Sequence, residues 1–296
     1  MKKKKGPLIL TGVLVILLIV YFGLSSWNKK QDKKEEKETV KVTDLDESTI
    51  TAIKYQVAAG EMSFEKEGDT WYYSEDKDFP LKQSEPEAIV KAAAQITADR
   101  KLEDGDSLDA YGLDDPNYSI EITEEDGTVT TVSFGDSTGT DVTVGDTGVV
   151  YTVASSVLDD FKTELSDLAQ LDEYPSIGSG NLKKEVITEN GTTTTYDSEN
   201  EDQEEEIAAV AGGLGAVSLT KVADYSVEDA DLAGYGLDEA SRITVEATYT
   251  KNEDEKTMKM YIGSEDGNGN RYVMLDGSKI VYQISDEVCK NILNQE

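Results

Sequence analysis

The sequence contains no histidine and a single cysteine, Cys289, in 296 residues. Without histidine, catalytic arrangements of the Ser-His-Asp and Cys-His kinds are excluded, and so is the most common zinc ligand. One cysteine cannot form a disulfide within the chain. Cys289 falls at an apolar position of a predicted helix, where a free cysteine packs as a small hydrophobic side chain. We therefore predict an inert core thiol and a chain that is not an enzyme, with no catalytic residue, no metal and no cofactor.

Basic residues are also scarce, since 28 Lys and Arg stand against 61 Asp and Glu, for a net charge of −33. They are unevenly placed. Residues 1–41 carry ten lysines and four acids, a net charge of +6, whereas residues 42–296 carry a net charge of −39. Such a negative body repels phosphate backbones, so nucleic acid is not expected as a partner. It favours cations or basic partners instead.

Long apolar runs are absent except at one place, Pro7–Leu24, where 18 residues carry no charge. As a helix this run would measure about 27 Å, enough to cross a bilayer. Lys2–Lys5 precede it, and Trp27 follows at the position of an interfacial aromatic residue. A cleaved signal peptide is the alternative, but the residues that follow the apolar run lack a clean small-residue cleavage site. We predict a cytoplasmic basic head (1–6), a transmembrane anchor (7–27) in contact with membrane lipid, and a single-pass protein of the cell membrane whose globular part is extracytoplasmic.

The rest of the chain is built around a repeated motif. The stretch Ala110–Pro116, which reads AYGLDDP, returns 124 residues later as Gly234–Ala240, which reads GYGLDEA. The segments that follow each copy also correspond, so one unit occurs twice. The predicted boundaries are a charged linker (28–44), repeat one (45–173), a linker rich in Pro, Gly and Ser (174–180) and repeat two (181–296).

Each repeat combines strand and helix signals. Alternating residues flank Gly68-Asp69 and Asn190-Gly191, a pattern that predicts a hairpin at each pair. Helices are expected from Ser84 and over 207–219, and closing helices after Ser155 and from Ser285. The fold class predicted is α+β: two tandem repeats, each a mainly antiparallel sheet with two helices, behind one N-terminal transmembrane helix.

The repeated motif itself is interpreted as structural. Its tyrosines can pack against the core, its glycines permit a tight turn, and its leucines fill the core. Its first aspartates can bond back to backbone amides. Trp71 is expected to pack in the core rather than to serve as a ligand platform, and the alternative for the motif is a ligand-facing edge. The candidate residues are Trp71, Tyr111, Gly112, Leu113, Asp114, Pro116, Tyr235, Gly236, Leu237 and Asp238.

Further patterns in the sequence are only weak indications of catalysis, of calcium binding or of a docking site. Carboxylate pairs, which glycosidases use, arise by chance in so acidic a chain. The loop 266–270 resembles the start of a calcium loop, but Arg271 and Gly277 stand where that pattern needs Gly and Glu. Hairpin loops are the better interpretation there and at the corresponding loop, 135–141. The acidic stretch 197–206 reads as an exposed loop before a helix, with docking of a basic partner as the alternative.

The two repeats resemble a bacterial family, the domain of unknown function 4340. The resemblance covers about residues 45–296. It rests on Gly68–Tyr73, Ala98–Arg100, Ala110–Pro116 and Phe134-Gly135, which recur in part as Tyr235–Asp238 and Tyr261–Gly263. It implies a membrane-anchored extracytoplasmic module associated with ABC-transporter systems, and it carries over no catalytic residue. Our hypothesis is a non-catalytic binding or scaffold module whose partner is a membrane protein such as an ABC-transporter permease. The alternatives are a cell-envelope hydrolase using paired carboxylates and a cation-binding surface protein.

Overall fold

The computed structural model describes residues 40–295, apart from 58–59, 104 and 136–139. The predicted basic head and transmembrane anchor therefore lie outside the described residues. None of the helices that the structure does describe is both long and apolar enough to cross a membrane.

The described residues are mostly β-structure. Seventeen strands form three sheets, beside four α-helices of 4 to 12 residues. The predicted α+β class is therefore wrong: the described part of the chain is a β-sheet protein with short helices. The error came from reading runs of helically spaced apolar residues as whole helices.

The clearest example is the helix predicted after Ser155. The structure has only α3 (Ser156–Asp159) and, after a break, the 3-10 turn η4 (Leu165–Leu168). Beyond this turn the backbone is extended, because it pairs with the segment before α2: the N–H of Lys82 donates to the Leu168 carbonyl at 2.9 Å. Two short turns can bury apolar residues at the same spacing as one helix, so the spacing did not distinguish them.

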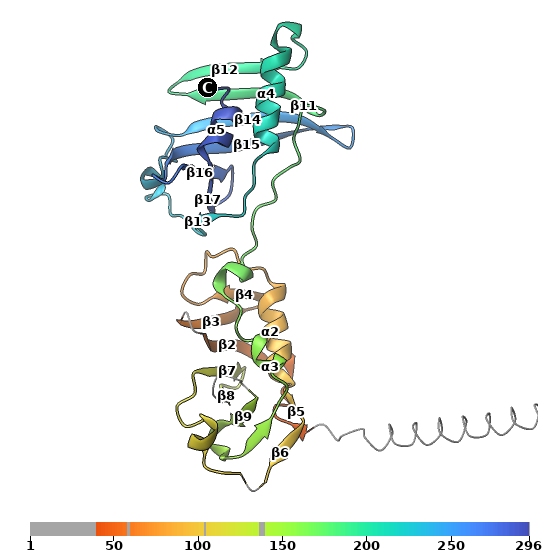
Figure 1. Cartoon of the computed structure of the whole chain (residues 1–296), viewed down its shortest axis with the longest axis vertical. Helices are drawn as coiled ribbons and strands as arrows, with labels where there is room; N and C mark the ends of the chain where they lie inside the picture. Colours follow the sequence, from red (N-terminus) through yellow and green to blue (C-terminus); the bar gives the residue numbers. More distant parts are fainter. Residues whose placement is uncertain (1–39, 58–59, 104, 136–139, 296) are drawn as a thin grey trace, which may run out of the picture. The chain divides into compact units, whose positions relative to one another are not determined.

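Repeat one forms an eight-stranded sheet in the order β4-β3-β2-β7-β8-β9-β10-β6 (Figure 1). All pairings that the structure describes in it are antiparallel, and the predicted turn at Gly68 joins β3 to β4. The helix predicted from Ser84 is present as α2 (Ser84–Ala94). The strands are β2 (Ile50–Val57), β3 (Gly60–Glu67), β4 (Thr70–Tyr73), β6 (Arg100–Leu102), β7 (Tyr118–Glu124), β8 (Val129–Phe134), β9 (Asp141–Val144) and β10 (Val150–Thr152).

The last residues of the predicted charged linker belong to the fold. β1 (Val40–Lys41) pairs with β5 (Thr97–Ala98) in a small two-stranded sheet. Thr43 is buried, and its hydroxyl donates to the Ala93 carbonyl at 2.7 Å and accepts from the Ile96 amide at 2.8 Å. The chain is therefore fixed against the end of α2 before repeat one was expected to begin.

Repeat two forms a seven-stranded sheet in the order β12-β11-β14-β15-β16-β17-β13. From β14 onward this is the order of the first sheet from β7 onward, with β13 at the edge where β6 lies. The extra strand of the first sheet is β4, which carries Trp71. The strands are β11 (Leu182–Glu189), β12 (Thr192–Asp197), β13 (Val222–Asp224), β14 (Ile243–Lys251), β15 (Asp254–Glu265), β16 (Asn270–Leu275) and β17 (Val281–Ser285). The predicted Asn190-Gly191 turn joins β11 to β12 with φ of 49° and 76°, as a two-residue hairpin loop requires.

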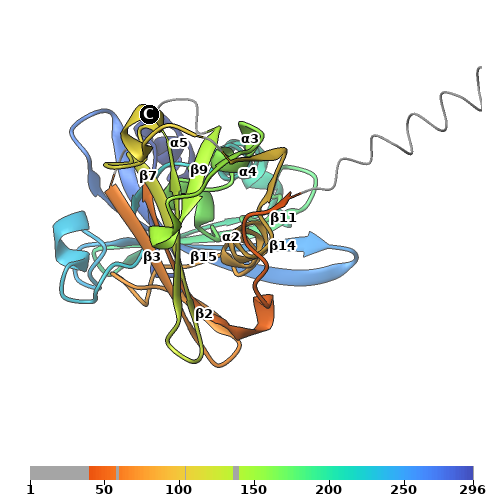
Figure 2. The same cartoon turned by 90° about the horizontal axis from the view of Figure 1, so that it is seen from below.

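Two helices, α4 (Glu204–Gly215) and α5 (Asp286–Ile292), cover one face of this sheet (Figures 1 and 2). They approach each other closely at Gly213, where a Cβ atom would lie 2.5 Å from the Ile292 nitrogen. Glycine costs helix stability, but here it lets two helices meet. Cys289, on the inner face of α5, is fully buried in the core.

The chain divides into two compact units. The first comprises the residues up to 63 together with 87–163, and the second comprises 64–86 together with 164–296. The second unit holds the whole of the seven-stranded sheet.

Candidate functional site

The repeated motif forms the same turn twice. A 3-10 turn, η2 (Leu108–Tyr111) or η6 (Leu232–Tyr235), ends at a glycine in the left-handed region, with φ of 65° at Gly112 and 67° at Gly236. The leucine after each glycine is buried, at 4% exposure for Leu113 and 0% for Leu237. The motif therefore reverses the chain and places one leucine in the core.

A second glycine in each repeat explains why the turn sits where it does. A Cβ atom on Gly135, just after β8, would lie 2.1 Å from the Tyr111 carbonyl oxygen, and one on Gly263 would lie 2.2 Å from that of Tyr235. No side chain fits at either place. The recurrence of these glycines was visible in the sequence, but their contact with the distant turn was not.

The polar groups of the motif form different hydrogen bonds in its two copies. The Tyr235 hydroxyl donates to Asp224 Oδ2 at 2.9 Å, and burial together with this carboxylate raises the pKa of Tyr235 to about 12. The Tyr111 hydroxyl instead accepts from the Asp106 amide at 3.1 Å. The structure describes no hydrogen bond to the Asp114 or Asp238 carboxylate. It is the backbone carbonyl of Asp238 that accepts, from the amides of the two residues at 241 and 242.

Trp71 and Pro116 complete the set of predicted residues. Trp71 is 2% exposed, and its backbone N–H and carbonyl both bond to the Gln83 side chain, at 2.8 and 3.0 Å. Pro116 is half-buried beside the first turn. Neither these two nor the motif residues line the cavity described below.

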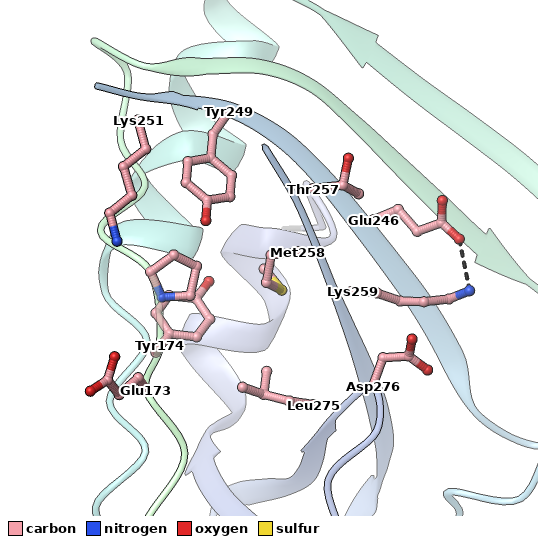
Figure 3. Close-up of a pocket in the computed structure, with 11 residues that line it drawn as sticks. Glu173, Tyr174, Glu246, Tyr249, Lys251, Thr257, Met258, Lys259, Leu275 and Asp276 are labelled. Atoms are coloured by element: carbon pink, nitrogen blue, oxygen red, sulfur yellow. Dashed lines mark ion pairs between the residues drawn. The ribbon is translucent and has the colours of Figure 1, made fainter. Parts of the chain in front are cut away.

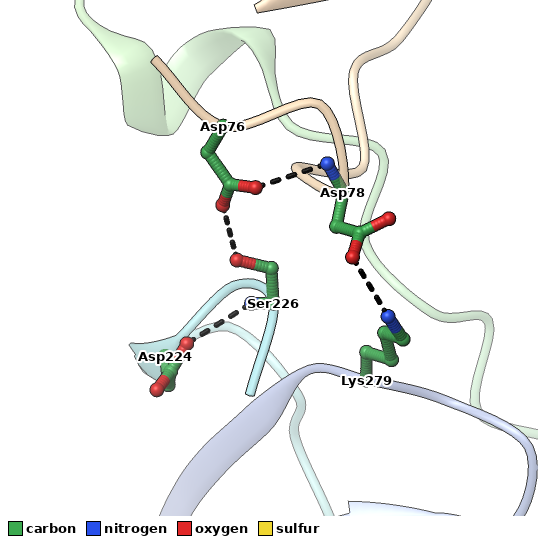
Figure 4. Close-up of polar contacts among 5 residues, drawn as sticks. All are labelled: Asp76, Asp78, Asp224, Ser226 and Lys279. Carbon is green, nitrogen blue, oxygen red and sulfur yellow. Dashed lines mark hydrogen bonds and ion pairs between the residues drawn. The ribbon is translucent and has the colours of Figure 1, made fainter. Parts of the chain in front are cut away.

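A polar cluster within the second unit extends from Asp224, the partner of Tyr235 (Figure 4). Asp224 accepts from the Ser226 amide at 3.0 Å, and the Ser226 hydroxyl donates to Asp76. Nearby, Lys279 pairs with Asp78 at 2.9 Å. The loop after β4 is thereby bonded to the end of β13, a contact that no local pattern in the sequence indicated.

A cavity on repeat two measures about 580 Å³ (Figure 3). One wall is the strand β15 at Thr257–Lys259, and the opposite wall is the segment Glu173–Pro175, which precedes the sheet. Tyr249, Met258 and Leu275 supply apolar surface between them. The cavity therefore lies between a strand and the linker that the sequence placed between the repeats.

Charged side chains surround the cavity mouth. Lys259 pairs with Glu246 across β14 and β15 at 3.0 Å, and this carboxylate raises the pKa of Lys259. Asp276 accepts a hydrogen bond from the Tyr261 hydroxyl. Glu173 and Lys251 are exposed at the other side. With Lys259 partnered, carboxylates outnumber the remaining ammonium groups at this rim.

Behind the cavity wall lies a buried carboxyl group without a partner. Glu185, on β11, is 0% exposed, and neither of its oxygens has a hydrogen bond among the described residues. Burial raises its pKa to about 8. The Tyr174 hydroxyl is likewise buried and unpartnered, and its pKa is raised by burial, by the Glu185 charge and by Tyr249. These three side chains therefore form one cluster, of which Tyr174 and Tyr249 line the cavity.

Tyr174 is carried by a segment fixed at both ends, residues 172–178, which we call the strap. At its start, Asp172 accepts from the Ser278 and Tyr282 hydroxyls at 2.6 and 2.9 Å. At its end, Asn181 donates to the Ser176 carbonyl at 3.0 Å and accepts from the Gly178 amide at 2.8 Å. The strap is thus bonded on either side of Tyr174, while the Tyr174 hydroxyl itself has no partner. The sequence patterns predicted residues 172–173 as the end of repeat one and 174–180 as a linker.

The loop resembling a calcium site is satisfied by protein donors. Asp266 accepts from the amides of Asn268 and Asn270 at 2.7 and 3.0 Å, and from the side chains of Asn270 and Gln283 at 2.8 and 2.9 Å. These hydrogen bonds lower its pKa. The described residues contain no group of three or more metal-ligating side chains. Much of the corresponding loop of repeat one, 136–139, lies outside the described residues.

Comparison with known proteins gives one result. A family model described as Domain of unknown function (DUF4340) matches residues 71–213 and, a second time, residues 195–295. Together the matches cover most of the chain; they overlap at 195–213, and the first extends into repeat two. No curated protein and no solved structure matches the chain.

Proposed function

The chain belongs to the DUF4340 family, as its motifs indicated, and we propose that it is a non-catalytic binding module at the outer face of the cell membrane. In this proposal the cavity on repeat two receives an extended, basic segment of a membrane-protein partner. An ABC-transporter permease is the partner that the family resemblance favours. The observation that carries the proposal is an unpaired strand edge beside the cavity.

That edge belongs to β15. Among the described residues, β14 pairs with β15 from Asp254 onward, whereas β16 pairs with it only between Met260 and Glu265. Residues 254–258 therefore have a strand on one side only. A free edge presents backbone N–H and C=O groups that can pair with an added strand. The cavity provides the space for such a strand between this edge and the strap.

The charge of the site favours a basic segment. Glu173 and Asp276 are exposed at the rim, and Lys259 is already paired with Glu246. The body carrying the site has a net charge of −39 over residues 42–296. Complementary charge steers a partner toward such a surface and suppresses acidic competitors. Main-chain pairing would supply the affinity, and the rim would supply the selectivity.

The hydrolase alternative depends on two carboxylates working as acid and base. In the cavity, Glu246 is held by Lys259, and Glu185 is sealed behind Tyr174. Neither arrangement presents a carboxyl pair to a substrate. Turnover of a saccharide or peptide by the full chain, lost in Glu246→Gln, would favour the hydrolase.

Site-specific photocrosslinking tests the binding site. A photoreactive amino acid at Thr257, which is exposed on the β15 edge, should form an adduct with a membrane protein in intact cells, identified by mass spectrometry. The same group at exposed Thr220 is the control and should form none. Glu173→Lys should weaken the Thr257 adduct, while Glu199→Lys, an equal charge change outside the cavity, should not. Absence of an adduct at Thr257, or equal adducts at both positions, would contradict the proposal.

The location is tested separately. If the body is extracytoplasmic, protease added to intact protoplasts should digest the chain beyond Lys41, because nothing would shield the repeats from the medium. A cytoplasmic marker protein should survive the same treatment. Full protection of the repeats until the protoplasts are lysed would place them inside the cell.

A further inference from the structure

We propose that Glu185 and Tyr174 make the strap a proton-operated gate over the cavity, seated while Glu185 is protonated and released when Glu185 is ionised. The proposal gives a regulation to the site of the proposed function. Its structural basis, however, is the strap itself and does not require that the partner be known.

The geometry places Tyr174 next to both the Glu185 carboxyl group and the cavity. Glu185 lies on the buried face of β11, directly opposite Ala247 of β14. Tyr249, two residues further along β14, lines the cavity together with Tyr174 of the strap. Of these cavity residues, Tyr174 is on a segment outside the sheet, and its hydroxyl is held by no hydrogen bond. Lifting the strap is therefore the least disruptive way to bring solvent to Glu185.

The surroundings of Glu185 offer no charge to stabilise its ionised form. On β12 its directly opposite neighbour is Tyr196, and on β14 it is Ala247. The buried residues of α4, which packs on β11, are apolar. The charge of Glu185 acts on the Tyr174 hydroxyl, whose pKa it raises together with burial, so that hydroxyl is neutral near pH 7. Burial in these surroundings raises the pKa of Glu185.

An unpaired carboxylate cannot stay buried without a large cost, so ionisation must be accompanied by solvation. With the strap seated, the pKa of Glu185 is about 8. With the strap lifted and the group in water, the pKa of Glu185 returns toward its ordinary value of 4.5. The lifted state therefore binds fewer protons between these two values. Its population rises about tenfold for each pH unit in that window and levels off above it.

The strap is a suitable gate because its two anchors are independent of Glu185. Asp172 is bonded to Ser278 and Tyr282, and Asn181 to the Thr250 carbonyl at 3.1 Å. Ile177, near the end of the strap, is buried in the core of repeat two, so residues 173–175 are the part that can move without detaching from repeat two. When it lifts, the cavity joins the space around Glu185, and an ionised carboxylate becomes available to a basic partner. Proton release and partner binding would thus favour each other.

Amide hydrogen exchange on the full chain, from pH 5 to pH 9 and corrected for the intrinsic pH dependence, tests the gate. The Gly178 amide, which donates to the anchor Asn181, is the internal reference and should stay protected. The amides to follow are those of Glu173 and Tyr174, between the two anchors. In the wild type their protection should fall about tenfold per pH unit up to about pH 8 and then remain constant. In Glu185→Gln it should not depend on pH. Glu189→Gln, at an exposed acid of the same strand, should behave as the wild type.

Three results would overturn the gate. The first is strap protection that, after correction, does not depend on pH in the wild type. The second is the same dependence of protection on pH in Glu185→Gln. The third is an equal loss of protection in the strap and in the β14–β15 ladder, which would mean global unfolding. If Glu185→Gln does not fold, Glu185→Met provides the same test with an apolar side chain of similar length. The exchange measurement uses no partner, so absence of the Thr257 crosslink would contradict the proposed function without contradicting the gate. Absence of pH-dependent exchange would contradict the gate without contradicting the proposed function.

Discussion

The chain should lose stability as the pH rises from 5 to 8, by about 4 kcal/mol, with Glu185 as the main source of the loss. In the folded state burial raises the pKa of Glu185 to about 8, whereas in the unfolded chain the carboxyl group has its ordinary pKa of 4.5. A group whose folded pKa is raised contributes its full stability below the unfolded pKa. That contribution is lost progressively as the pH rises to the folded pKa, at up to about 1.4 kcal/mol per unit.

Urea denaturation at pH 5, 6.5 and 8, followed by circular dichroism, measures this effect. Protonation of other acids also reduces self-repulsion at low pH in so negative a chain, so the comparison must be with a variant. Glu185→Gln should be more stable than the wild type at pH 8 and should keep only the background dependence. Glu189→Gln should follow the wild type. Equal slopes in the wild type and in Glu185→Gln would show that Glu185 is solvated in the folded protein.

A second large effect is expected at the glycine that receives the motif turn. Gly263→Ala should lower the free energy of unfolding on the order of 3 kcal/mol, as overpacking does in a site that cannot relax. The added Cβ would lie 2.2 Å from the Tyr235 carbonyl oxygen and 3.0 Å from Leu237 Cγ. Both belong to the turn that inserts Leu237 in the core. The turn would have to move as a whole.

Gly234→Ala is the matched control, two residues before the turn glycine. A Cβ there meets nothing within 4 Å and its φ is not in the left-handed region, so the change should stay within about 0.5 kcal/mol. Thermal and urea unfolding of both variants measure the two changes in the free energy of unfolding. If Gly263→Ala unfolds as the wild type does, the contact between the turn and Gly263 is not structural, and the motif should be reconsidered as a binding edge.

The sequence was most informative where structure is determined locally. Asn190-Gly191 predicted a hairpin because its two residues tolerate positive φ, and the repeat of the tyrosine-glycine-leucine-aspartate motif predicted two equivalent turns. It was less informative about helices, because Leu158 and Leu168 have helical spacing yet belong to separate short turns. The physical reason is that competing long-range backbone pairing, here with the segment at Lys82, does not appear in a local pattern.

Local patterns in the sequence predicted almost nothing of the cavity and of the buried carboxyl group behind it. Glu185 stands in a strand beside Val186-Ile187, and two adjacent apolar residues leave the buried face ambiguous. Its burial depends on pairing with β14, some sixty residues away, and on the strap, which composition marks as a linker. The open edge of β15 follows from the unequal lengths of β15 and β16, 12 and 6 residues. Such differences emerge only when strands are paired.

The bond between Tyr235 and Asp224 also has a consequence for how the chain folds during synthesis. The edge strand β13 emerges from the ribosome well before β17, its partner in the sheet, because some 55 residues separate them at about 5–20 residues per second. An unpaired edge strand invites aggregation in that interval. The Tyr235 hydroxyl reaches Asp224 at the end of β13 across only 11 residues, so the η6 turn can hold this nascent edge in place until the C-terminus arrives.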